Sequence, residues 1–303
     1  MSQCQWRIIF RMPVTPSPLR YPGGKTAITP MVSELINANN LRSAHYVEPY
    51  AGGAGLALSL LFNGYVPKIH LNDIDVSIWS FWHSILYRTD EFIELIEKTN
   101  ITLQEWHQQK EIQDSKASVD SLTLGFSSFF LNRTNRSGII QKAGVIGGLE
   151  QKGDYKLDCR FNKPDLILKI RRIANHANQI NIYNMDAVKF IKYIESSVER
   201  SFYCIDPPYF VKGQSLYTNF YEPRDHQELA SAINNIKGKW MMTYDYASEI
   251  KRLYSDYRLF TFSLNYSAAD KKKGTELLIA SPSLRVPLKL NLKRVPKKEI
   301  GIF

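Results

Sequence analysis

The residues best suited to chemistry form the segment Asp206-Pro207-Pro208-Tyr209, which follows the apolar run 201–205. The run predicts a buried strand, and the two prolines end it because neither can donate a backbone hydrogen bond. A carboxylate and an aromatic ring are therefore held together at the carboxyl end of a strand, where open α/β sheets bind ligands. An acceptor beside a stacking surface suits a planar group that carries an NH2, such as a nucleobase with an exocyclic amine.

The elements that must position this segment alternate between strands and helices. A strand at 45–49 leads through the glycine loop 50–55 into an apolar helix at 56–62, and a second strand at 68–71 follows. This order predicts a parallel sheet. Further strands are expected at 180–183, 201–205, 240–243, 258–262 and 276–280.

The pattern changes between the second and third of these strands. Helical periodicity dominates from residue 76 to about 130, and a glycine-rich, basic stretch follows up to 158. We therefore expect an insertion at 77–165 within one α/β domain, whose two parts are residues 1–76 and 166–303.

Two glycine-rich turns are candidate ligand loops. Gly53-Ala54-Gly55 begins like a dinucleotide fingerprint, but Leu58 stands where glycine or alanine is required. Asp73 lies about twenty residues beyond, a spacing that suits ribose hydroxyls. A loop that only packs a strand against a helix explains these glycines nearly as well. The second turn, 21–25, lacks the spacer of a phosphate-binding P-loop.

A further acidic residue, Asp186, follows the strand expected at 180–183. Its carboxylate could accept a hydrogen bond from an adenine amine. It could equally cap the helix expected at 187–194, and from its position alone the cap is the better explanation.

The composition favours a polyanionic partner. Lys and Arg number 39 against 29 Asp and Glu, a formal net charge of +10 over 303 residues, which favours nucleic acid ahead of an anionic membrane surface. Cys4, Cys159 and Cys204 form no CxxC pair, so neither a metal site nor a disulfide framework is expected, and a reducing cytoplasm fits best. No apolar stretch approaches the ~20 residues of a membrane helix.

Four strand ends carry, in order, a glycine loop, Asp73, Asp186 and the Asp-Pro-Pro-Tyr segment. In this arrangement the chain resembles the Dam-like N6-adenine DNA methyltransferases. The matching segments cover the catalytic half in the family's order: Leu19–Lys25, Tyr46–Gly55, Leu71–Asp75, Phe129–Gly138, Arg160–Lys163 and Ser201–Tyr209. The resemblance implies an α/β fold, namely a Rossmann-like S-adenosylmethionine-dependent methyltransferase sheet with an inserted, mainly helical DNA-recognition domain.

The resemblance also implies S-adenosyl-L-methionine as the methyl donor. The residues expected to hold it are Tyr21, Lys25, Glu48, Pro49, Tyr50, Gly52, Gly53, Asp73, Asp186 and Asp206. The sequence departs from the family at Tyr21, where tryptophan is frequent, and at Tyr50 and Ala54, where phenylalanine and glycine are common.

The catalytic residues expected from the motif are Asp206, Pro207, Pro208 and Tyr209. We expect Asp206 and the Pro207 carbonyl to accept the two N–H groups of the adenine amine, which localises the nitrogen lone pair, while Tyr209 stacks on the base. Direct displacement of the sulfonium methyl then depends on positioning and electrostatics. A base within a duplex cannot reach such a corner, so it must flip out.

The expected insertion is the candidate reader of double-stranded DNA. Its side chains suited to base edges and phosphates are Asn132, Arg133, Asn135, Arg136 and Lys142. For any one of them, a basic loop that contacts only phosphates is an equally good explanation.

Three other functions compete with adenine methylation. An N4-cytosine methyltransferase uses the same amine chemistry, but Asp rather than Ser before Pro-Pro favours adenine by resemblance. A non-catalytic, basic DNA-binding protein on a degenerate methyltransferase fold is disfavoured by the intact motif, and a nicotinamide oxidoreductase by the broken fingerprint. The recognition sequence and the oligomeric state stay open, as does the choice between a partner of a cognate restriction endonuclease, a phage-encoded enzyme and a solitary one.

Overall fold

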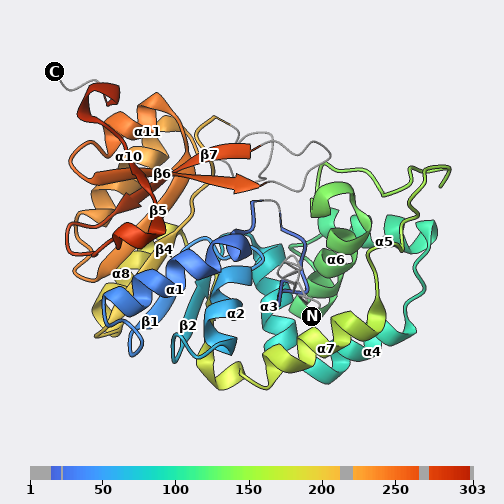
Figure 1. The fold of residues 1–303 in the computed structure, drawn as a ribbon. Coiled ribbons are helices and arrows are strands. Elements are labelled where there is room, and N and C mark those ends of the chain that lie inside the picture. The colour runs from blue at the N-terminus through green and yellow to red at the C-terminus, as the bar shows by residue number, and fades with distance from the viewer. Residues whose placement is uncertain (1–14, 22, 212–220, 266–272, 301–303) are drawn as a thin grey trace, which may run out of the picture.

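The computed structural model describes residues 15–21, 23–211, 221–265 and 273–300. Its strands are β1 (His45–Glu48), β2 (Ile69–Asn72), β3 (Ile180–Tyr183), β4 (Ser201–Ile205), β5 (Lys239–Asp245), β6 (Arg258–Asn265), β7 (Lys273–Ala280) and β8 (Lys293–Arg294). They form an eight-stranded sheet in the order β3-β2-β1-β4-β5-β7-β6-β8 (Figure 1). The expected α/β fold is confirmed.

The sheet is parallel from β3 through β5, as the strand–helix alternation predicts. The last part differs, because β7 pairs antiparallel with both β5 and β6. Only residues 266–272 join β6 to β7, and a parallel crossover needs a dozen residues or more. The short connection therefore reverses the direction of β7.

Helices cover both faces of the sheet. On one face lie α1 (Thr29–Ala38) and α2 (Gly55–Phe62), and on the other lie α8 (Ala187–Ser197), α10 (Pro223–Ile233) and α11 (Ser248–Leu253). The central strand β4 is buried along its whole length: Phe202 and Cys204 join the first core, and Tyr203 and Ile205 join the second. A strand buried on both faces reads as a continuous apolar run, as this one does.

The chain between β2 and β3 is mainly helical. It forms α3 (Val76–Tyr87), α4 (Thr89–Lys98), α5 (Leu103–Asp114), α6 (Ser121–Thr134) and α7 (Lys163–Ala174), grouped apart from α8, α10 and α11 (Figure 1). Aromatic rings fill its interior: Phe81 stacks on Phe129 with the ring centroids 5.9 Å apart, and Phe92 meets both edge-on. This interior is continuous with the core on the α1–α2 face. The division of the chain at residues 77 and 165 stays a prediction.

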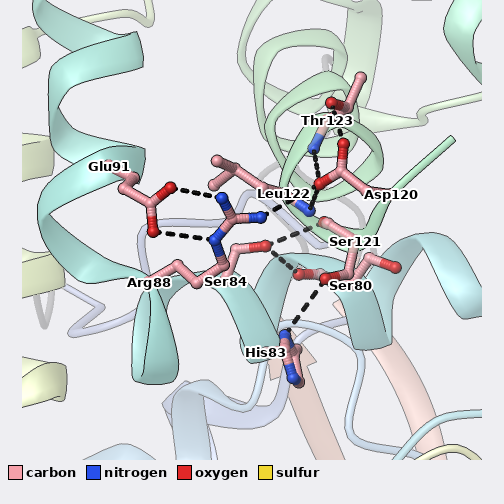
Figure 2. A network of polar contacts seen from close by, with 9 residues as sticks. All are labelled: Ser80, His83, Ser84, Arg88, Glu91, Asp120, Ser121, Leu122 and Thr123. Atoms are coloured by element: carbon pink, nitrogen blue, oxygen red, sulfur yellow. Dashed lines mark hydrogen bonds and ion pairs between the residues drawn. The ribbon is translucent and has the colours of Figure 1, made fainter.

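A polar junction fixes the start of α6 against α3 and α4 (Figure 2). Arg88, at the turn between α3 and α4, pairs with Glu91 and lies 3.2 Å from the Asp120 carboxylate. Asp120 in turn caps α6 by accepting from the N–H groups of Leu122 and Thr123. The junction orients α6, whose last turn carries Asn132 to Arg20 and Arg133 to Pro18, just before the glycine-rich turn.

Within the described ranges, every helix falls short of the combination of length and apolar composition that a bilayer span demands.

Candidate active site

The Asp206 carboxylate sits directly after β4, as predicted, and both of its oxygens are held. Thr243 on β5 donates its hydroxyl to Oδ1 over 2.6 Å, and the Lys25 ammonium lies 2.9 Å from Oδ2. The side chain is nevertheless 22% exposed. Asp206 is thus fixed in orientation and still open to a substrate, because each carboxylate oxygen has a second lone pair.

We call the group of side chains around this carboxylate the Asp206 corner; it comprises Lys25, Asp206, Tyr209, Thr243, Asp245 and Glu276. Lys25 supplies its positive charge and is only 7% exposed. Besides Asp206, its ammonium donates to the Tyr209 hydroxyl over 3.0 Å and to the Gly23 carbonyl over 3.1 Å. These bonds use all three N–H groups of the ammonium. Burial opposes the charge, but Asp206 and Glu276 outweigh it and raise the pKa of Lys25. The resemblance implies that Lys25 contacts the cofactor, and this contact stays a prediction.

Tyr209 is a fixed part of the same corner. Its hydroxyl accepts from Lys25 and donates to Glu276 on β7. The side chain is 5% exposed, and the Lys25 nitrogen lies 5.2 Å from the ring centroid. The hydroxyl contacts fix the position of the outer end of the ring, while stacking of a target base on it stays a prediction.

Three polar residues of this site were missed by the sequence analysis. Thr243 and Glu276 are 0% and 1% exposed, and Asp245 accepts from the N–H groups of Phe210 and Val211 at 3.0 and 2.9 Å. A signal was available for Thr243, a polar side chain inside an otherwise apolar strand, since buried polar residues are rarer and more informative than exposed apolar ones. Asp245 and Glu276 lie beside the polar ends of their strands, where an acidic residue gives no such signal.

The two glycine turns interlock. A Cβ on Gly52, whose φ is +45°, would lie 2.5 Å from the Tyr21 ring, and one on Gly53 would lie 2.8 Å from the Tyr21 Cβ. Close packing against Tyr21 thus requires both glycines. The Gly52 N–H also donates to Asp73 Oδ2 over 2.9 Å, and the Asp75 N–H donates to Oδ1. Burial raises the pKa of Asp73 to about 7.

The remaining residues of the main loop are tied to the sheet. Glu48 is buried and accepts the Tyr46 hydroxyl over 2.9 Å. The buried Pro49 accepts from the Asn72 amide at its carbonyl, 3.0 Å away. The Tyr50 hydroxyl lies 2.7 Å from that of Tyr221. The loop expected to hold the cofactor is therefore rigidly supported, and its contacts with a cofactor stay a prediction.

Burial, chiefly, raises the pKa of Glu48 to about 8, so this carboxyl is mostly protonated at neutral pH. Because the native state binds a proton that the unfolded state releases above pH about 4.5, native stability falls as pH rises from there to about 8. Glu48→Gln removes this titration. We expect the stability of the variant, relative to the wild type, to rise across this window by up to about 1.4 kcal/mol per pH unit. Urea unfolding at pH 5.5, 7 and 8.5 measures the change. Glu97→Gln, at an exposed position on α4, is the control and should show no such trend.

Asp186 caps α8, since its carboxylate accepts from the Lys189 N–H over 3.1 Å. The capping interpretation is confirmed, and a contact with an adenine amine stays a prediction.

Asn132 and Asn135, two of the expected DNA contacts, are completely buried. The Asn132 side chain accepts from the Arg20 N–H and donates to the carbonyls of Arg20 and Gly138. Asn135 accepts from Trp106 and donates to two carbonyls of the same loop. Both amides therefore shape the backbone of the loop, and this burial leaves them no open edge for a base.

The other expected DNA contacts differ in exposure. Arg136 and Lys142 are exposed, whereas Arg133 is half-buried and donates its Nε–H to the Arg160 carbonyl over 2.6 Å. Burial, followed by the charge of Arg20, lowers the pKa of Arg133 to about 10. Burial and the charge of Arg160 likewise lower the pKa of Arg20.

Arg20, Arg133 and Arg160 thus form a group of like charges, here called the arginine group. Among the described residues, no carboxylate lies within ion-pair distance of any of the three. Asp165 acts on Arg133 only from beyond ion-pair distance. Like charges held together with so little compensation favour an anionic ligand. Arg20 and Arg160 lie in segments that resemble the family, but neither is among the DNA contacts expected from the sequence.

Among the residues that the structure describes, no three His, Cys, Asp or Glu side chains lie close enough together to hold a metal ion. A search of the curated proteins finds no significant match. A family model for D12 class N6 adenine-specific DNA methyltransferases matches residues 21–268, which include the interlocked glycine turns and the whole Asp206 corner except Glu276. The chain belongs to this family of adenine-specific DNA methyltransferases.

Proposed function

We propose that the protein transfers a methyl group from S-adenosyl-L-methionine to the N6 amine of adenine in double-stranded DNA, at the corner formed by Asp206. The observation that carries the proposal is a carboxylate at the end of β4 that is oriented by Thr243 and Lys25 and is still 22% exposed. An oriented acceptor costs no reorganisation when charge develops on the reacting nitrogen.

The protein's own groups activate the adenine amine. Asp206 accepts one N–H and the Pro207 carbonyl accepts the other, which draws the lone pair out of the ring. Positive charge grows on the nitrogen as it is alkylated, and the nearby carboxylate stabilises it. Lys25 keeps the carboxylate in place. The extra proton then leaves the nitrogen through the hydrogen bond to Asp206.

S-adenosyl-L-methionine would supply an electrophilic methyl group on a positively charged sulfur. Asp73 fits its ribose, because each carboxylate oxygen takes one backbone N–H and keeps a lone pair for a hydroxyl. The other candidate contacts are Tyr21, Lys25, Glu48, Pro49, Tyr50, Gly52, Gly53, Asp186 and Asp206. The side chains of Asp73, Asp186 and Asp206 are hydrogen-bond acceptors with negative charge, which suits a nucleoside with a cationic amino-acid arm.

Adenine in a duplex cannot reach a corner whose carboxylate is only 22% exposed. The target base therefore flips out of the helix, as is usual for enzymes that modify bases. The arginine group, with Arg136 and Lys142, would hold the phosphates on either side of it.

Mass spectrometry of digested DNA tests the proposal, after incubation of the protein with DNA and methyl-labelled S-adenosyl-L-methionine. We expect labelled N6-methyladenine. Labelled N4-methylcytosine would favour the cytosine alternative, and DNA binding without any label would favour the non-catalytic alternative. Sequencing the modified DNA gives the recognition site, which any cognate restriction endonuclease would share.

The phosphate contacts are tested by Arg20→Gln and Arg160→Gln. Each variant should weaken binding to duplexes of any sequence and reduce the slope of log affinity against log salt by about 1, because one phosphate contact is lost. Fluorescence anisotropy at several salt concentrations measures this. Arg224→Gln is the control, since Arg224 is exposed on α10 and pairs with Glu228. Slopes equal to the wild type in both variants would place the DNA elsewhere.

A further inference from the structure

We propose that Glu276 is a positioning residue for the target base, which it serves by fixing the Tyr209 ring and the Lys25 ammonium. The inference rests on the proposed function and adds to it a residue from the far end of the chain. Glu276 lies on β7 and is 1% exposed. It accepts the Tyr209 hydroxyl, and its Oε2 lies 3.8 Å from the Lys25 nitrogen.

The register of the sheet explains why this residue reaches the motif. Asp245 on β5 is directly opposite Glu276 on β7, and Thr243 is opposite Leu278. Side chains at alternate positions of a strand share a face, and so do residues directly opposite each other. Thr243, Asp245 and Glu276 therefore lie on one face at the carboxyl end of β5.

Each of these three side chains holds a different part of the motif. Thr243 donates to Asp206, and Glu276 accepts from Tyr209. Asp245 accepts from the backbone N–H groups of residues 210 and 211. The motif is thus held at three places: the Asp206 carboxylate, the Tyr209 hydroxyl and the backbone directly after Tyr209.

A buried carboxylate contributes little to the free energy of unfolding, because its desolvation cancels most of the attraction to a nearby cation. Polar groups that break the apolar pattern of a strand are expected at functional sites. Glu276 is a buried polar residue directly before the buried apolar run 277–280, and both of its contacts within the described residues lead to residues of the corner. Orientation of the corner, rather than stability, accounts for a carboxylate at this position.

A double-mutant cycle tests the inference. Glu276→Ala and Tyr209→Phe each remove one end of the same hydrogen bond, and Phe keeps the ring. We expect each variant to slow single-turnover methyl transfer by about 10- to 100-fold, with DNA affinity within about threefold of the wild type. The double variant should lose much less than the product of the two single losses. Losses that multiply would overturn the inference.

Glu195→Ala is the matched control, since Glu195 on α8 accepts the hydroxyl of the buried Tyr203 over 2.7 Å, away from the corner. It should leave methyl transfer within about twofold of the wild type. An equal loss in both alanine variants would mean a general effect of losing a tyrosine–glutamate bond, and would contradict a positioning role.

A second readout needs no turnover. In a protein with 3-fluorotyrosine at position 209, the ¹⁹F resonance should be shifted from that of free fluorotyrosine in the wild type and in Glu195→Ala. In Glu276→Ala it should move toward the free value. An unmoved resonance would overturn the inference even in an active enzyme. A wild type with a shifted resonance but no methyl transfer would instead contradict the proposed function.

Discussion

Replacing Asp206 by alanine is expected to reduce methyl transfer to adenine by about 10³-fold or more, because the variant loses the oriented acceptor and its negative charge together. Loss of a single preorganised donor in other enzymes costs 10²- to 10³-fold, and Asp206 is the only charged group of the motif. Single-turnover transfer from labelled S-adenosyl-L-methionine measures the effect, on a duplex that carries the modified sequence.

DNA binding should survive this substitution, since the arginine group does not touch Asp206 in the described residues. Anisotropy should therefore give an affinity within about threefold of the wild type. Asp256→Ala, at an exposed position after α11, is the control for loss of an aspartate. Substantial turnover in Asp206→Ala would remove the acceptor from the mechanism.

Lys25→Met is expected to have the second largest effect, on stability as well as on turnover. Met has a similar length without charge, so the variant leaves Asp206 and Glu276 facing each other with no ammonium between them. Removing one partner of a buried ion pair costs about 3–5 kcal/mol. Urea unfolding at pH 7 measures this loss, and the deficit should shrink as pH falls, because protonation removes the stranded charges.

Turnover in Lys25→Met should fall at least as far as in Glu276→Ala, because both Asp206 and Tyr209 lose a contact. The exposed Lys192→Met on α8 is the control. A Lys25→Met protein as stable as the wild type at pH 7 would mean that the ion pair contributes nothing to the corner.

Local patterns in the sequence were enough to predict the parallel half of the sheet and the place of the reactive motif. The run before Asp206 is apolar on both faces, and the two prolines after it can only end a strand. The strand end and the aspartate are therefore determined by neighbours in the chain. The direction of β7 was not predicted, because it depends on a seven-residue connection whose geometry follows from length rather than from strand pattern.

The partners within the corner could not be predicted in the same way. Lys25 reaches Tyr209 across 184 positions of sequence, and Tyr209 reaches Glu276 across 67. No periodicity links such positions, so Glu276 appeared only as the first residue of an expected strand. Asn132 and Asn135 show the reverse error: their types suit base edges, but burial and backbone bonds decide their role.

The distance of Glu276 from Lys25 along the chain has a consequence during synthesis. β7 emerges from the ribosome after β1 to β6, so Tyr209 has no Glu276 acceptor until almost the whole chain has been made. With Glu276 in the positioning role inferred above, a polypeptide that ends before residue 276 would lack this contact. Full speed of transfer would therefore arrive only with the closing strands.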